Sequence, residues 1–361
     1  MTPKVSLRVA GMDYGGWTSI QAERSLESLA GTFELTVSET WAAGPGQFVT
    51  RPIKAGQPCQ LLFDGEPVLT GYVDDVEYSY DKETHEVRVR GRDKTADLID
   101  CSGGAFGMTK VAGGQWSNQT LLEVANSLCA AFQIEATSDV EQGAPLPAWS
   151  ILPGETAFEC IEKFARFKAM LLTTDPLGNL LITRANQLAP ILTTLEHGKN
   201  ILEVRATYST RKRGNVYTLM SENAWSNDVV AAALDPGVPR HRPIALMAND
   251  IIVPAGKLSP AGVYDLLLAR AQWEANVRAA RGIQIEVTVQ GWAHAEGLWL
   301  PNRRVLVRIP WLGLDGEVLL LSGVRWMLDD NGTRARLTLT RQEAFSLLPV
   351  QIKGFWESAK P

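Results

Sequence analysis

Two stretches of this chain, residues 66–99 and 317–348, carry the same succession of strand and turn signals. Each runs from a strand through a small residue and a glycine (Thr70-Gly71, Ser322-Gly323) into a second strand, an acidic turn and an alternating strand. A further strand precedes each copy, and a short helical tail follows it. The identities between the copies are few, so chance similarity stays open as an alternative, but the shared order favours a duplicated β-domain.

The alternation of apolar and polar residues predicts half-buried strands. Such alternation occurs in "VSLRV", "TFELTVS" and "HEVRVRG", where Val87 and Val89 should face inward and Arg88 and Arg90 outward. Asp64-Gly65 suits a tight hairpin turn, because both residues tolerate positive φ. We predict a mainly β fold with α+β insertions: two similar antiparallel, tube-like β-barrel domains plus smaller α+β domains.

Helical periodicity begins near Gln115. Residues 117–132 predict one helix, with Ser117 or Asn118 as N-cap, and residues 156–168 predict another that starts with a capping box. A hairpin follows, and residues 115–186 therefore form a compact α+β unit. A later helix should begin near Ser259 and end at Gly282.

The resulting domain division places the first tube-like barrel at residues 1–100 and an α+β domain at 101–190. The second barrel combines residues 200–222 with 283–347, an inserted loop and helix occupies 223–282, and residues 348–361 form a C-terminal tail.

The composition excludes some classes of protein. The chain has 35 lysines and arginines against 40 aspartates and glutamates, a net charge of −5, which argues against a protein that grips nucleic acid along its backbone. No apolar run approaches the roughly 20 residues of a membrane span, and the N-terminus lacks a secretory signal. The four cysteines form no CxxC pair, so we expect free thiols in a reducing compartment.

The acidic stretch 71–102 could indicate a catalytic site, but its pattern favours a solvated sheet face. Asp74 and Asp75 are adjacent on a predicted strand and should point to opposite faces, while Asp81, Glu83 and His85 fall in a turn. The four histidines and the glycines match no zinc or nucleotide-binding motif. We therefore expect no enzymatic activity, no cofactor and no metal.

The tryptophans could form a carbohydrate-binding platform, but most fall in or beside strands, where core packing or a subunit interface is more usual. Three of them are candidates for a subunit interface: Trp292, Trp299 and Trp311.

Several segments together resemble a known family. They include "RSLESLAGTFELTVS", "GYVDDVEYSYDKETHEVRVRGRDKTADLIDCS", "RHRPIALMAND" and "GTRARLTLTRQEAF". In the same order, they are similar to the baseplate hub protein of Mu-like contractile-tailed phages, the tail protein P family. Related hubs occur in T-even phages and in the N-terminal part of type VI secretion spikes. The most specific box contains Gly91, Arg92, Asp93, Lys94, Thr95, Asp97 and Leu98.

The resemblance implies a non-enzymatic, homotrimeric ring in the baseplate of the virion, assembled in the host cytoplasm. Its implied partners are the central spike protein, the tail tube or tape-measure end and the baseplate wedge proteins, with DNA only in transit along the axis. We expect edge strands at the seams of the ring and a lining without a strongly basic patch. The alternative is a peptidoglycan- or carbohydrate-binding module, because the 115–186 unit resembles small wall-binding domains in outline.

Overall fold

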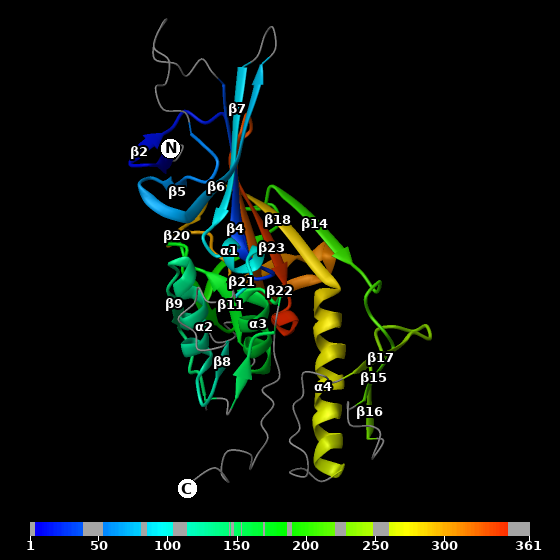
Figure 1. Ribbon diagram of the computed structural model, residues 1–361. Coiled ribbons are helices and arrows are strands. Elements are labelled where there is room, and N and C mark those ends of the chain that lie inside the picture. Colours follow the sequence, from blue (N-terminus) through cyan, green and yellow to red (C-terminus); the bar gives the residue numbers. More distant parts are fainter. Residues whose placement is uncertain are drawn as a thin grey trace, which may run out of the picture.

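A computed structural model provides the fold of the chain. It describes residues 4–38, 53–80, 85–103, 114–143, 145, 148–152, 154–168, 170–185, 190–220, 229–247 and 260–345. Strands dominate, and the helices lie mostly in two smaller parts below a large sheet (Figure 1). The predicted C-terminal tail and the Ser259 cap lie outside these residues. Of the helices in the described ranges, none is long and apolar enough to cross a membrane.

The first β unit has the strand order β3-β4-β7-β6-β5-β1-β2. Its strands are β1 (Val5–Val9), β2 (Met12–Tyr14), β3 (Ser19–Ser25), β4 (Ser28–Ser38), β5 (Pro58–Phe63), β6 (Glu66–Tyr80) and β7 (His85–Asp93). Asp64 and Gly65 both have positive φ, as the predicted hairpin turn between β5 and β6 requires. The apolar positions of β1 and β4 are buried as expected.

The second β unit repeats this order as β14-β18-β23-β22-β21-β13. Its strands are β13 (Ile191–Glu196), β14 (Glu203–Tyr208), β18 (Ile283–Gln290), β21 (Arg303–Ile309), β22 (Leu314–Asp329) and β23 (Gly332–Thr340), with the short pair β19 (Ala293–His294) and β20 (Gly297–Leu298) and the turn η3 (Pro310–Leu312). A helical turn follows the last strand of each unit, α1 (Ala96–Asp100) and η4 (Gln342–Phe345). The copies differ at one end, where β1 runs antiparallel to β5 but β13 runs parallel to β21. The predicted repeat is thus found in the strand order, and closure of either unit into a barrel stays a prediction.

The two units form one continuous sheet. Strands β3 and β22 pair antiparallel, from Ser25 opposite Gly323 to Ile20 opposite Leu328. Buried residues of both units pack into a single apolar cluster, which holds Leu7 and Leu35 of the first and Val287 and Leu337 of the second. The two repeats therefore share a core.

The α+β unit contains β8 (Gln115–Trp116), α2 (Leu121–Cys129), η2 (Ala130–Phe132), β9 (Ala136–Ser138), β10 (Trp149–Ser150), α3 (Ala157–Phe167), β11 (Leu171–Thr174) and β12 (Leu180–Thr183). The capping box of α3 is present, with Thr156 and Glu159 each accepting from the other's backbone N–H. The predicted N-cap of α2 was wrong: Thr120, not Ser117 or Asn118, caps the helix and forms a second capping box with Glu123.

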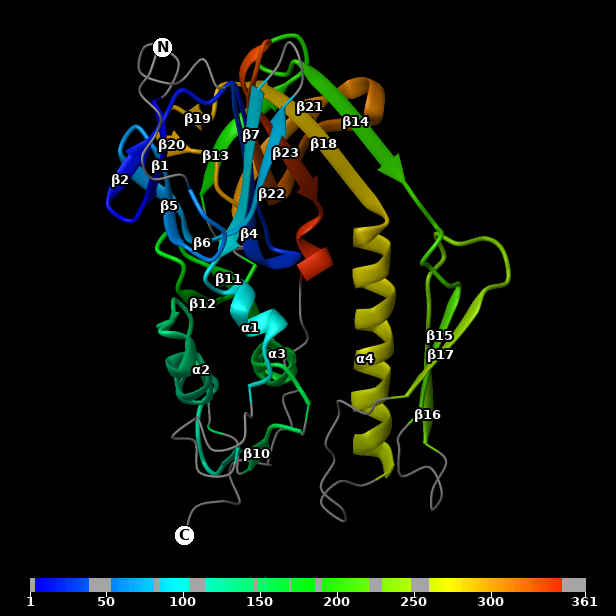
Figure 2. The ribbon, with the colours of Figure 1, turned by 45° about the horizontal axis from the view of Figure 1, so that its top comes forward.

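The remaining elements form an arm, defined here as β15 (Val216–Met220), β16 (Val230–Leu234), β17 (Pro243–Met247) and α4 (Pro260–Arg281). The arm and the α+β unit project from the same side of the large sheet, with α4 on the inner flank of the arm (Figures 1 and 2). We predicted residues 200–222 in the second barrel, but only β14 joins it. The strand β15 pairs with β16 and β17 instead, and β13, which the prediction left out, joins the second unit.

Candidate functional site

The motif that carries the family resemblance begins at a buried carboxylate. Asp93 ends β7 with 0% of its surface exposed. Its Oδ2 accepts the backbone N–H of Gly31 at 2.8 Å, and the guanidinium of Arg24 lies 3.4 Å away. Burial raises the pKa of Asp93 to about 6, while Arg24 and hydrogen bonds from the Gly31 and Thr70 backbone act in the opposite direction.

Arg24 connects this carboxylate to the α+β unit. Its guanidinium donates to the carbonyl oxygens of Thr174 at 3.0 Å and Asp175 at 2.7 Å, at the tip of the β11–β12 hairpin. Thr174 donates to the Leu29 carbonyl at 2.7 Å and so accepts from Thr95 of the motif at 2.6 Å. The motif therefore fastens the α+β unit to the first β unit through buried polar contacts.

Close backbone approach explains a glycine at this junction. Gly178 has φ +79°, and a Cβ there would collide with the carbonyl oxygen of Thr70. The Thr70 hydroxyl donates to the Pro176 carbonyl at 2.9 Å, and its carbonyl accepts the backbone N–H of Lys94 at 3.1 Å. The hairpin tip is held directly against β6.

The other motif residues are also structural. Leu98 is fully buried in the core of the α+β unit, and a Cβ on Gly91 would collide with the ring of Phe33. Arg92 pairs with Asp74 at 2.6 Å and with Asp100 at 2.8 Å. Asp97 lies in the first turn of α1, with its pKa raised by partial burial and by Asp100. The motif thus serves the fold, and its buried Asp93 departs from the solvated sheet face that the sequence favoured for this stretch.

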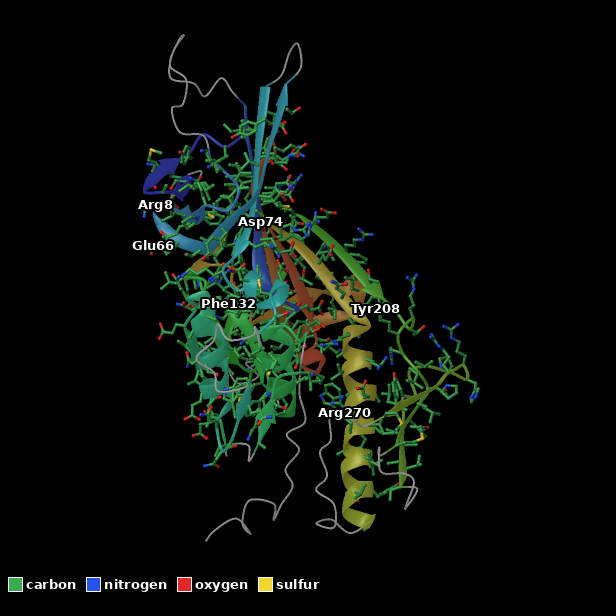
Figure 3. The ribbon with its side chains drawn as sticks, viewed as in Figure 1. Arg8, Glu66, Asp74, Phe132, Tyr208 and Arg270 are labelled. Carbon is green, nitrogen blue, oxygen red and sulfur yellow. The ribbon has the colours of Figure 1, made fainter. Side chains whose placement is uncertain are left out.

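One face of the continuous sheet carries paired charges. Arg90 donates to Glu34 at 2.8 Å across β7 and β4, and Arg88 lies 3.5 Å from the same carboxylate. Arg325 donates to Glu23 at 2.8 Å across the β22–β3 junction. Four arginines and seven carboxylates meet on this ion-paired face: Arg88, Arg90, Arg92, Arg325, Glu23, Glu34, Asp74, Asp75, Glu77, Glu86 and Asp100. Figure 3 labels Asp74 on it.

A hollow of about 610 Å³ lies on the ion-paired face. It is lined by Gln21, Ala22, Glu23, Thr32, Phe33, Glu34, Asp74, Asp75, Arg90, Gly91, Arg92 and Arg325. Our expectation that Asp74 and Asp75 point to opposite faces was wrong: Asp74 pairs with Arg92, and Asp75 lies opposite Arg90 in the strand register and acts on its charge, so both lie on the ion-paired face. The β6–β7 register shifts between Val73 and Asp75, and such a bulge interrupts the alternation of a regular strand.

The described part of the chain contains neither a thiol with a lowered pKa nor a cluster of metal-binding side chains. Its four cysteines are free, with Cys101 exposed and the other three buried. Burial raises the pKa of Cys59 and Cys129 to about 12 and that of Cys160 to about 11, so these three are unreactive thiols. No group of three or more histidine, cysteine, aspartate or glutamate side chains in the described residues could hold a metal ion.

The three tryptophans proposed for a subunit interface have different environments. Trp292 and Trp299 are 3% and 4% exposed and belong to the shared core, so they are not available to a partner chain. Trp311 is 62% exposed on η3 and stays a candidate. Periodicity alone could not separate these cases, because all three lie in or beside strands.

Family models match most of the described chain. Residues 4–93 match the N-terminal domain of "Mu phage baseplate assembly protein GpP-like", and residues 266–348 match the fourth domain of that protein. Residues 95–184 match the second domain of "Baseplate hub protein gp44-like". The α+β unit, whose outline resembles small wall-binding domains, therefore matches a hub domain.

One relative is similar in sequence along almost the whole chain. The baseplate hub protein gp44 of Escherichia phage Mu is 32% identical over 368 aligned residues, which cover 97% of this chain and 91% of the relative. The chain belongs to the baseplate hub proteins of Mu-like phages. A hub protein of this family is a component of the phage tail, and the predicted resemblance is confirmed.

Solved structures with similar folds include a phage tail protein and a secretion-system protein. The 43 kDa tail protein of prophage MuSo2 from Shewanella oneidensis has a TM-score of 0.82 and 32% identity, covering 96% of this chain and 100% of that one. An Escherichia coli component of the type VI secretion system, described as similar to T4 tail proteins gp27 and gp5, has a TM-score of 0.54 and 11% identity, covering 92% and 76%. The hub shares its fold with this secretion component.

Proposed function

We propose that three copies of this hub protein form a closed ring that joins the six-fold tail tube to the three-fold central spike. The observation that carries the proposal is the repeat of one strand order in two β units fused through β3 and β22. Three chains with two alike units each present six similar positions to the tube while keeping three-fold symmetry toward the spike.

The free ends of the sheet support closure through edge strands. The hydrogen-bonded path runs from β14 to β2, and each of these strands pairs on one side only within the described residues. Unpaired strand edges invite pairing with another chain, and a ring closes them without leaving a free end. Exposed aromatic residues lie at the β14 edge: Tyr208 is 57% exposed and its hydroxyl donates to Leu312, beside Trp311.

The ion-paired face suits a lining along which DNA passes. Its arginines are paired with carboxylates, and the carboxylates outnumber them. Duplex DNA gains affinity for each phosphate that a free cation neutralises, so a lining with paired arginines lets DNA slide. That the lining lacks a strongly basic patch stays a prediction.

The proposed ring acts as a scaffold and not as an enzyme. Its further partners are the tube or tape-measure end above, the spike below and the wedge proteins around it, and it assembles in the host cytoplasm before joining the virion. The support is the family membership and the structural role of Asp93 and Thr95 of the motif in the buried junction.

Light scattering on the purified full chain tests the ring. We expect a particle of three 39.5 kDa chains at micromolar concentration. The Trp311→Glu variant should give folded single chains, because a charge at an apolar seam opposes association. Tyr264→Glu is the matched control, since Tyr264 is 43% exposed but lies on α4, which is not part of the edge strands β14 and β2. A wild-type protein that stays a single chain would contradict this account of the ring.

A further inference from the structure

The arm has an apolar sheet face that the described residues leave uncovered. On the other side of the sheet, Leu219, Ala231 and Ala233 pack against Leu267 and Ala271 of α4. The residues that alternate with them point away from α4. They form three cross-strand rows: Leu234, Val216 and Pro243; Ala232, Thr218 and Ala245; Val230, Met220 and Met247.

This outer face is open and carries no charge. Leu234 is 74% exposed, Met247 50% and Val230 43%. A half-solvated sheet normally alternates apolar and polar residues, whereas near-continuous apolar strands are typical of sheets covered on both faces. "VYTLM", "VAAAL" and "PIALM" are of the second kind, so the sequence of the arm is suited to a second covering layer.

A basic rim borders one end of this face. Arg211, Arg240, His241 and Arg242 line a cleft of about 670 Å³ next to the row of Val216, and Figure 3 labels Tyr208 at its edge. Arg242 is fixed there by the carbonyl oxygens of Thr210 and Arg211, both at 2.8 Å. Residues 209–220 and 229–247 hold five basic residues and one acidic residue, Asp235, which pairs with Arg213.

The α+β unit has the opposite charge. Residues 95–184 hold ten acidic and five basic residues. It also presents an exposed apolar side chain, Leu152, which is 57% exposed. Within one chain the outer face of the arm cannot reach this unit, because α4 lies between them (Figures 1 and 2).

We propose that the outer face of the arm docks on the α+β unit of a neighbouring copy of this chain. This inference rests on the proposed ring. In a closed ring the outer flank of one copy meets the opposite flank of the next, and both appendages project from the same side of the sheet. The apolar rows form the centre of the contact, and the basic rim meets carboxylates of the α+β unit, as an apolar core with a polar rim requires.

Photo-cross-linking tests the contact. The purified full chain carries p-benzoylphenylalanine in place of Leu234 or Met247, and isotopically labelled protein is mixed with unlabelled protein during assembly. We expect cross-links from the arm of one copy to residues 95–184 of another. The same probe in place of Tyr78, exposed on β6, should not reach that unit. Cross-links confined to one chain would overturn the inference. Cross-links from the arm to a different tail protein, with the same probes in assembled tails, would also overturn it.

A substitution provides the second measurement. Leu234→Glu should weaken self-association at least about 100-fold, because the contact would bury an unpaired charge. The variant should fold normally, because Leu234 is solvent-exposed in the single chain. Circular dichroism checks this. A three-chain particle that tolerates Leu234→Glu and gives no cross-link to residues 95–184 leaves the ring standing and refutes the docking. A wild-type single chain refutes both.

Discussion

The ring of Phe63 in β5 stacks on the ring of Trp292 beyond β18, with centroids 4.3 Å apart and planes 28° apart. The same phenylalanine meets Trp326 of β22 edge-on, at 5.9 Å. A side chain of the first β unit is thus a central part of the core of the second.

The first prediction concerns this shared core. Phe63→Ala should lower the free energy of unfolding by about 3–5 kcal/mol, because it removes a buried ring and the contacts of that ring with two tryptophans. Both units should unfold in one transition in urea, followed by tryptophan fluorescence. Leu177→Ala, at an exposed position, is the control and should change stability little. Two separate transitions in the wild-type protein would show that the units are independent.

The second prediction concerns pH. Burial raises the pKa of Asp93 from the usual 3.8 to about 6, so the folded protein binds this proton more tightly than the unfolded chain does. The contribution of the proton to stability is therefore fully present below pH 3.8 and is lost as the pH rises through about 6. Asp93→Asn should flatten the pH profile of urea unfolding in this window, whereas Asp13→Asn should keep the wild-type shape there. An unchanged profile in Asp93→Asn would contradict the assignment.

The third prediction concerns the junction of the α+β unit. Arg24→Ala removes donors to Asp93, Thr174 and Asp175 and leaves the carboxylate buried without its partner. The expected cost is about 3–5 kcal/mol, with faster proteolysis within residues 95–184. Arg8→Ala breaks an exposed pair with Asp13 and should change stability little, because solvent screens such a pair. Equal effects of the two variants would show that burial of the Arg24 pair is unimportant.

The fourth prediction concerns DNA. Glu34→Gln removes the carboxylate nearest to Arg90 and leaves Arg90 with Glu77 at 3.7 Å, so the variant should bind duplex DNA more tightly than the wild-type protein at low salt. The slope of log affinity against log salt concentration should become more negative by about one for each added phosphate contact. Fluorescence anisotropy measures both. Asp13→Asn, which releases Arg8 away from this face, should bind more weakly than Glu34→Gln. Strong binding by the wild-type protein would refute the paired lining.

Local patterns in the sequence determined much of the secondary structure. Alternation placed Val89 in the core and Arg90 on the polar face, and the capping box at Thr156 started α3 where it was expected. The Asp64-Gly65 turn and the repeated strand order were also predictable. Each of these depends on residues a few positions apart, or on comparing one stretch of the chain with another.

The tertiary structure decided which strands pair and which apolar residues reach a core. Strand β15 has the same alternation as β14, yet it joins β16 and β17 and not the second β unit, because alternation shows which side of a strand is buried and not which strands it pairs with. The bulge at Asp74 changed the side on which a carboxylate lies. The fusion of β3 to β22 turned Trp292 from a candidate interface residue into a core residue, since burial is set by the sheet that surrounds a side chain and not by its own periodicity.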